Sequence, residues 1–342
     1  MNGARGLQPP GRCRVDGGQV ESASVTHGRQ RRLAALLLAL LSALAAGTAV
    51  RTQQPVQGPP VVFRSGVELV RVDALVVRDG GVVKGLRPAD FEVRDNGVLQ
   101  EVVSASLEQI PIDALFVFDL SGSVSEANAR LLRGAAWMFL DGLTPEDRAG
   151  LVTFNARPVL AQPLAGRLEL VRTALTSIAG GGSTALNDAV YAALRSREPG
   201  DTRGAVVIFT DGADNISWLS AAEVVEAARR SDVIVHTVAV GALRAAMPGP
   251  WGRAMTVGAA DNPLLHDLGV ETGGQVWSAG WPELANAFRA VLDDLRSRYL
   301  LTYYPSNVAG SGWHTLEVKV KRGGAKVTAR TGYYRSLQPP GR

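Results

Sequence analysis

Short apolar runs alternate with amphipathic stretches through the middle of the chain. Continuous apolar runs at residues 115–118 and 205–209 indicate strands that are covered on both faces. The same reading predicts further strands over 147–154 and 233–240, and helices over 126–140, 168–178, 221–230 and 281–300. Strands that alternate with helices indicate the α/β class, here a doubly wound, mostly parallel sheet with helices on both faces.

Two flanking stretches follow another pattern, in which apolar and polar residues alternate. The first, residues 67–107, is interrupted by Asp79-Gly80-Gly81 and Asp95-Asn96-Gly97, which are typical hairpin turns. The second covers residues 300–334 and also turns at glycines. Because neither stretch is long enough to bury much core alone, we expect the two to pair into one β-sandwich, with the α/β domain inserted between them.

The N-terminus has the pattern of a secretory signal. Arginines at 29, 31 and 32 precede an apolar run over 33–50, which ends in small residues and is followed by a polar, proline-containing stretch. We expect cleavage after Ala49; the alternative is an uncleaved membrane tether through residues 33–50. The expected organisation is a signal or anchor at 1–50, a linker at 51–61, a β module at 62–110, the α/β domain at 111–299, a C-terminal β segment at 300–336 and a tail at 337–342.

Charge and cysteine content narrow the function classes. Residues 1–50 contain six arginines and only two acidic residues. Residues 51–342 therefore hold 30 of the 36 basic and 30 of the 32 acidic side chains, which balance in charge. A neutral body without a basic stripe argues against nucleic-acid binding. The sole cysteine, Cys13, precedes the apolar run, so the exported part has neither a disulfide nor thiol chemistry.

Oxygen-bearing side chains cluster where two predicted strands finish. Asp119, Ser121 and Ser123 follow the run at 115–118, and Asp211 follows the run at 205–209. Open α/β sheets bind ligands beyond the carboxyl ends of their strands. Carboxylates and hydroxyls suit Mg²⁺ or Mn²⁺ better than zinc. The alternative is that both aspartates only cap the helices that follow them.

A glycine turn with the sequence GGGST, at residues 180–184, lies between these two segments. In this order and spacing the three segments resemble the von Willebrand factor A domain and its metal-ion-dependent adhesion site. The resemblance implies a shell around Mg²⁺, or Mn²⁺ or Ca²⁺ in its place, with some contacts through water; its members would be Asp119, Ser121, Ser123, Thr184 and Asp211. Gly-Ser-Thr replaces the more common Gly-Gly-Thr, so either Ser183 or Thr184 supplies the loop hydroxyl, and we favour Thr184.

The flanks extend the resemblance. The stretches GLRPADFEVRDNGVLQEV at 85–102 and KVTARTGYYR at 326–335 are similar to the VWFA-related group of secreted bacterial proteins. A long Gly-, Pro- and Ala-rich stretch at 242–262 leaves the expected metal end of the sheet. We expect it, with Trp251 exposed, to form part of the rim of the site and to help choose the partner; the alternative is a mobile insertion with no contact role.

The function implied by the resemblance is an exported module that binds a partner protein through a metal. An Asp or Glu carboxylate of the partner would enter an open metal position. The runner-up is a structural envelope protein in which the metal only stabilises loops. Enzymatic activity is not expected, because the four histidines belong to no recognisable triad and GGGST lacks the lysine of a phosphate-binding loop.

Overall fold

The computed structural model describes residues 69–107, 109–198, 200–241, 262–308 and 310–335, and the backbone of two short paired strands, β11 (Met247–Pro248) and β12 (Ala254–Met255). The predicted signal or anchor at 1–50, the linker at 51–61 and the tail at 337–342 lie outside these residues. Among the described residues, no helix is long and apolar enough to cross a membrane.

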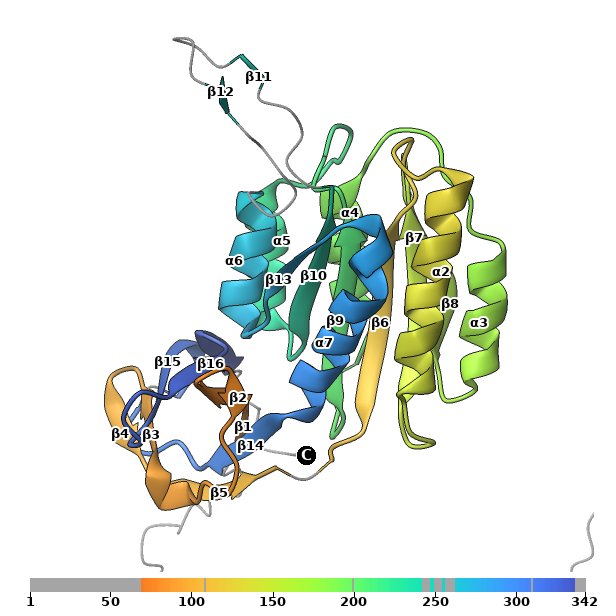
Figure 1. Ribbon diagram of the computed structural model, residues 1–342. Coiled ribbons are helices and arrows are strands. Elements are labelled where there is room, and N and C mark those ends of the chain that lie inside the picture. The colour runs from red at the N-terminus through yellow and green to blue at the C-terminus, as the bar shows by residue number, and fades with distance from the viewer. Residues whose placement is uncertain are drawn as a thin grey trace, which may run out of the picture. The chain divides into compact units, whose positions relative to one another are not determined.

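A six-stranded sheet forms the centre of the α/β domain (Figure 1). Its strand order is β13-β10-β9-β6-β7-β8, and every neighbouring pair is parallel except β7 and β8. The strands are β6 (Ile112–Asp119), β7 (Arg148–Phe154), β8 (Pro158–Ala165), β9 (Arg203–Thr210), β10 (Ile234–Val240) and β13 (Val276–Ala279). All eight residues of β6 and of β9 are buried, because both strands are central and covered on both faces.

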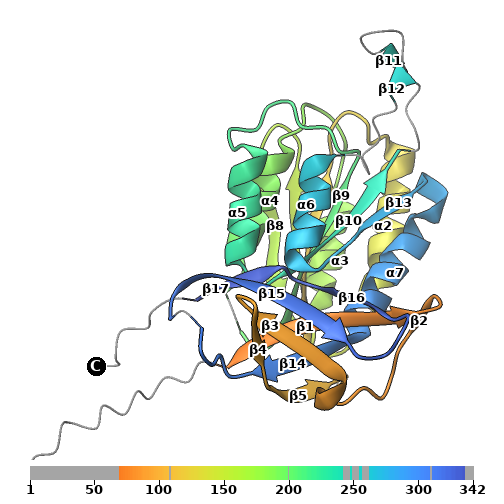
Figure 2. The same ribbon diagram turned by 90° about the vertical axis from the view of Figure 1, so that its left-hand side faces the viewer.

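Helices cover both faces of this sheet, which confirms the predicted fold class (Figures 1 and 2). One face packs against α2 (Glu126–Asp141), α3 (Leu168–Thr176) and α7 (Leu284–Arg296), and the other against α4 (Leu186–Arg195), α5 (Ala221–Arg230) and α6 (Pro263–Thr272). Along β6, Phe116 and Phe118 point to the first face and Leu115 and Val117 to the second. Because successive side chains of a strand point to opposite faces of the sheet, β6 contributes residues to the hydrophobic cores on both faces.

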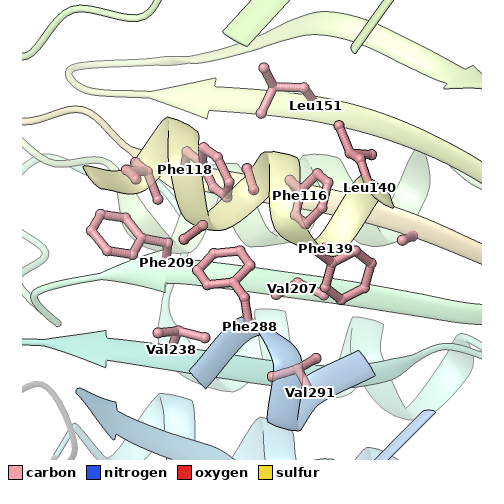
Figure 3. Close-up of a cluster of buried hydrophobic side chains, with 14 of the residues drawn as sticks. Phe116, Phe118, Phe139, Leu140, Leu151, Val207, Phe209, Val238, Phe288 and Val291 are labelled. Carbon is pink, nitrogen blue, oxygen red and sulfur yellow. The ribbon is translucent and has the colours of Figure 1, made fainter. Parts of the chain in front are cut away.

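Phenylalanine rings fill the core between β6 and the helices α2 and α7 (Figure 3). The ring centroids of Phe116 and Phe139 are 5.2 Å apart and those of Phe118 and Phe288 are 6.0 Å apart, both in edge-to-face geometry. Such pairs add about 0.5–1.5 kcal/mol each beyond the burial of their area. This packing holds β6, whose last residue is Asp119, in a fixed position.

The flanking stretches form a β module of two antiparallel sheets (Figure 2). One sheet has the order β16-β1-β14-β5, with β2 beside β1, and the other has the order β17-β15-β3-β4. Strands from the two ends of the chain pair directly, as in Val72 with Leu301. The strands are β1 (Val70–Arg78), β2 (Gly81–Val82), β3 (Phe91–Asp95), β4 (Val98–Gln100), β5 (Val102–Ser106), β14 (Arg298–Tyr303), β15 (Gly312–Val320), β16 (Lys326–Ala329) and β17 (Gly332–Arg335), and a 3₁₀ turn at Pro88–Asp90 precedes β3.

One predicted helix is too long. The expected helix over 281–300 is a 3₁₀ turn, Trp281–Glu283, followed by α7, which ends at Arg296. Residues 298–300 instead belong to β14, and Tyr299 lies fully inside the β module. The sequence pattern predicted a longer helix because Tyr299 is an apolar residue four positions after the buried Leu295, the spacing of one more helical turn.

The β module lies at the end of the central sheet where the parallel strands begin (Figure 1). At this end the buried carboxylate of Asp147, just before β7, accepts hydrogen bonds from the backbone N–H groups of Ile112 and Thr144, each at 2.6 Å, and from the guanidinium of Arg296. Burial raises the pKa of Asp147, but the Arg296 and backbone donors outweigh that effect and hold it below the ordinary value of 3.8.

Asp147→Asn is expected to lower the free energy of unfolding by about 1.5–3 kcal/mol at neutral pH, because it weakens charge-assisted hydrogen bonds. A carboxyl with a depressed folded-state pKa stabilises the fold above its unfolded-state pKa, and this contribution disappears as pH falls through the folded-state pKa. The difference between wild type and variant should therefore shrink below about pH 4. Urea unfolding of both proteins in EDTA at several pH values measures this difference in unfolding free energy. A difference that stays constant down to pH 2–3 would contradict the lowered pKa given to Asp147.

Candidate functional site: the carboxyl ends of β6 and β9

Asp119 is the innermost polar residue of the predicted site. It ends β6 and is 1% exposed. Its Oδ1 accepts the backbone N–H of Ser121 at 2.9 Å, and its Oδ2 accepts the hydroxyl of Thr210, the last residue of β9, at 2.7 Å. The hydroxyls of Ser121 and Ser123 are 3.4 Å apart. Asp119, Ser121 and Ser123 therefore gather on one tight turn.

The glycine turn is joined to this segment through backbone contacts. Gly181 N–H donates to the carbonyl of Leu120 at 2.8 Å, and Gly122 N–H donates to the carbonyl of Gly182 at 3.1 Å. A Cβ at Gly180 would lie 1.9 Å from the carbonyl oxygen of Val124, so only glycine fits there. The turn thus brings residues 183 and 184 up to the serines that follow β6.

Thr184 and Ser183 differ in exposure. Thr184 is 4% exposed, whereas Ser183 faces solvent. The backbone of Thr184 is fixed to the loop after β9, because its N–H donates to Asn215 Oδ1 at 3.0 Å and its carbonyl accepts Asn215 N–H at 3.0 Å. The buried hydroxyl at this position of the glycine turn is therefore that of Thr184.

Asp211 completes the group from the second strand. It follows Thr210 directly and is partly exposed, and its Oδ1 accepts the N–H of Ala213 at 3.2 Å. Thr210 also accepts the N–H of Gly212 at 3.0 Å, so one threonine orients both the Asp119 carboxylate and the turn that carries Asp211. All five residues predicted from the sequence thus lie on three loops that are hydrogen-bonded to one another.

The electrostatics of this cluster favour a cation. Burial raises the pKa of Asp119, and the negative charge of Asp211 raises it further, against the hydrogen bonds from Ser121 and Thr210. Two carboxylates therefore repel each other in a partly desolvated place, and a divalent cation between them would relieve that repulsion. Exposure increases from Asp119 and Ser121 outward to Ser123 and Asp211, so the outer side of the group faces solvent.

The donor set is rich in hydroxyls and poor in carboxylates. Across the part of the chain that the structure describes, no three His, Cys, Asp or Glu side chains gather as a metal-binding group. Two carboxylates with three hydroxyls are hard oxygen donors, which fit Mg²⁺, Mn²⁺ or Ca²⁺ and lack the nitrogen and sulfur ligands of structural zinc sites.

Sequence reasoning did not assign two residues that hold the site together. Thr210 positions Asp119, and Asn215 bridges the glycine turn and the loop after β9. The available signals were weak: a threonine before an aspartate, and an asparagine in a turn-forming DGADN stretch. The predicted rim residue Trp251 lies outside the described residues.

The family comparison agrees with this geometry. Residues 113–273 match the family model of the von Willebrand factor type A domain. The chain contains a von Willebrand factor type A (VWA) domain. The match begins inside β6 and ends just after α6, so it includes all five residues of the candidate site.

Two curated relatives match part of this chain. Inter-alpha-trypsin inhibitor heavy chain H4 of Homo sapiens is 29% identical over 155 residues, which is 40% of this chain and 17% of the relative. The same protein of Bos taurus is 28% identical over 120 residues, 31% of this chain and 13% of the relative. The chain thus spans less than a fifth of the length of these relatives.

Solved structures are similar over about half of the chain. BatB of Bacteroides thetaiotaomicron has 17% identity and a TM-score of 0.43, covering 54% of this chain and 97% of its own. Proximal thread matrix protein 1 from the mussel byssus, described with a zinc-occupied MIDAS motif, has 18% identity and a TM-score of 0.45, covering 57% of this chain and 48% of its own.

Proposed function

We propose that this protein is an exported, metal-dependent protein-binding module, in which a divalent cation at the VWA domain captures a carboxylate of a partner protein. VWA domains form a family of adhesion and protein-interaction modules. The observation that carries the proposal is the convergence of two carboxylates and three hydroxyls on three mutually bonded loops, with the outer side facing solvent.

Each residue would have a distinct part in holding the cation. Asp119 and Asp211 would balance its charge, and Ser121, Ser123 and Thr184 would supply neutral oxygens, some through water. The burial of Thr184 beside the exposed Ser183 favours Thr184 as the loop ligand. Bound there, the cation would act as a Lewis-acidic anchor for an incoming oxygen anion, and Mg²⁺ is the ion we expect.

Export of the protein rests on the sequence. The arginines before residues 33–50, the apolar run itself and the polar stretch after it are the features of a secretory signal. A cleaved signal and an uncleaved tether would both place the VWA domain outside the cytoplasm, where a partner on another surface could be reached.

The test of the proposal is a thermal melt of the protein titrated with Mg²⁺ and compared with EDTA. At Mg²⁺ about a hundredfold above its Kd, the free energy of unfolding should rise by about 2.7 kcal/mol, or roughly 5–10 °C in Tm. Asp119→Ala should abolish the rise. In EDTA the variant loses the acceptor of the Ser121 N–H and the Thr210 hydroxyl but also the repulsion between Asp119 and Asp211, so its Mg²⁺ response is measured against its own melt in EDTA.

Asp214→Ala is the matched control. Asp214 is an exposed carboxylate on the same loop as Asp211, and it accepts the N–H of Ser217 at 3.3 Å. It should keep the full response to Mg²⁺. A wild-type melt that ignores Mg²⁺, Mn²⁺ and Ca²⁺ alike, or equal responses of wild type and Asp119→Ala, would overturn the proposal. A full Mg²⁺ response without Mg²⁺-dependent capture of a carboxylate-bearing partner would instead favour the structural envelope role, in which the metal only stabilises loops.

A further inference from the structure

The loop between β9 and α5 carries a tryptophan whose side chain points into solvent. Trp218 is 95% exposed, the largest exposure among the large hydrophobic residues that the structure describes as exposed. Single exposed apolar residues are common, but a nearly fully exposed tryptophan leaves a large apolar surface in water. An exposed apolar group of this size marks a candidate contact point for another protein.

The backbone beneath Trp218 is rigidly held. The carboxylate of Asp188, in the first turn of α4, accepts the N–H of Trp218 at 3.1 Å and that of Leu219 at 3.0 Å. Asn187 Nδ2 donates to the carbonyl of Leu219 at 2.9 Å, and the hydroxyl of Ser217 accepts the N–H of Asp188 at 3.3 Å. Because four hydrogen bonds fasten the loop to the helix, docking a partner on Trp218 costs little ordering of the backbone.

Two more exposed apolar side chains lie on the loop that carries Trp218 and on the helix that anchors this loop. Ile216, two residues earlier on the loop, is 47% exposed, and Tyr191 of α4 is 37% exposed. Tyr191 stands three residues after Asp188, so both lie on the same side of α4, where the loop is fastened. We call Ile216, Trp218 and Tyr191 the tryptophan patch.

The tryptophan patch adjoins the candidate metal site. The loop that carries it begins at Asp211, and its Asn215 is bonded to Thr184 at both N–H and carbonyl. Thr184 lies two residues before α4 begins and Asp188 lies in its first turn, so the two residues that fasten the loop are close in the chain. The loop lies at the end of the sheet where β6 and β9 finish, away from the β module (Figures 1 and 2).

We propose that the metal position and the tryptophan patch form one two-part docking site for a protein segment that presents an Asp or Glu close to a bulky apolar or aromatic side chain. The inference rests on the proposed function, since the carboxylate would bind the cation. The apolar side chain would cover Trp218, which is the kind of rigid aromatic anchor that dominates binding energy at interfaces. Two contacts in fixed spacing give a selectivity for the partner that a single metal–carboxylate bond lacks.

The test uses a displayed peptide library in which one aspartate is fixed and the flanking positions are randomised. Peptides are captured on the protein in Mg²⁺ and released with EDTA. On the wild type, the released pool should be enriched in aromatic and large aliphatic residues at a constant offset from the aspartate. On Trp218→Ala this enrichment should disappear, and the best wild-type peptide should bind about tenfold or more weakly.

Two further variants sharpen the result. Trp218→Phe should restore part of the affinity, because it keeps an aromatic surface. Tyr304→Ala removes a 48% exposed aromatic from the β module and should bind like the wild type. Because Trp218 is exposed, Trp218→Ala should melt at the wild-type temperature and keep the full Mg²⁺ response, so a loss of peptide affinity reports the docking contact and not misfolding.

The outcomes separate the inference from the function on which it rests. Peptides that are captured in Mg²⁺ with no flanking preference, with enrichment of basic residues, or equally well by wild type and Trp218→Ala would overturn the tryptophan patch and leave the metal-dependent capture standing. A failure of the Mg²⁺ melt, with no peptide released by EDTA, would overturn both.

Discussion

Replacing Asp73 with alanine is expected to lower the free energy of unfolding by about 3–5 kcal/mol, because it leaves a buried guanidinium without its ion-pair partner. The guanidinium belongs to Arg203 at the start of β9, whose side chain is 1% exposed. Arg203 Nη2 lies 2.6 Å and Nε 2.8 Å from Asp73 Oδ1 on β1. Without Asp73, the acceptors left to Arg203 among the described residues are the backbone carbonyls of Leu295 and Arg298.

Urea unfolding of Asp73→Ala, Arg203→Met and the double variant measures this effect as a cycle. The double variant should be more stable than Asp73→Ala alone, since it buries no unpaired charge. Asp201→Ala is the matched control: Asp201 forms an exposed ion pair with Arg71 between the same two parts of the fold, and its loss should cost less than about 1 kcal/mol. Equal losses for Asp73→Ala and Asp201→Ala would refute the role given to the buried pair.

This ion pair could not be inferred from the sequence, because Asp73 and Arg203 are separated by 130 positions and belong to segments with different patterns. Local features such as tight turns could be predicted from the sequence. Asn96-Gly97, with φ values of 48° and 80°, turns between β3 and β4 as its residue types require. Long-range contacts depend on which segments pair, and residue spacing alone does not carry that information.

The edge strand β8 shows a second limit. Its sequence PVLAQPLA has two prolines and no regular alternation of apolar and polar residues, so the sequence did not predict a strand here. Proline is tolerated there because β8 is an edge strand, and its pairing with β7 is irregular at two points. The strand β13 and the helix α6 were also not assigned from the sequence.

The residues of the candidate site could be predicted from the sequence for a physical reason. A strand covered on both faces is a continuous apolar run, so the polar residues that follow it, such as Asp119 and Asp211, mark its carboxyl end. The hydrogen bonds by which Asn215 and Asp188 hold the loops could not be predicted from the sequence, because they join segments about 30 residues apart. The exposure of Trp218 depends on that fastening and was visible only in three dimensions.

The β module should depend strongly on one buried carboxylate. Asp95, at the end of β3, is fully buried, and its Oδ2 accepts hydrogen bonds from the hydroxyls of Tyr303 at 2.9 Å and Tyr333 at 2.8 Å. Its Oδ1 is 2.7 Å from His314 Nδ1. Tyr303 comes from one sheet of the module and the other three residues from the opposite sheet, so Asp95 joins the two sheets.

Asp95→Ala is therefore expected to cost about 3–5 kcal/mol, because it removes the acceptor of the buried Tyr303 hydroxyl and of the partly buried Tyr333 hydroxyl, and the partner of a buried histidine nitrogen. Glu92→Ala, on the same strand but in a partly exposed pair with Arg94, should cost less than about 1 kcal/mol. Urea unfolding followed by circular dichroism compares the two. If Asp95→Ala were no more destabilising than Glu92→Ala, the carboxylate would not hold the sheets together. If the large loss occurs while the Mg²⁺ response is kept, the β module contributes to folding and the opposite end of the VWA domain to binding.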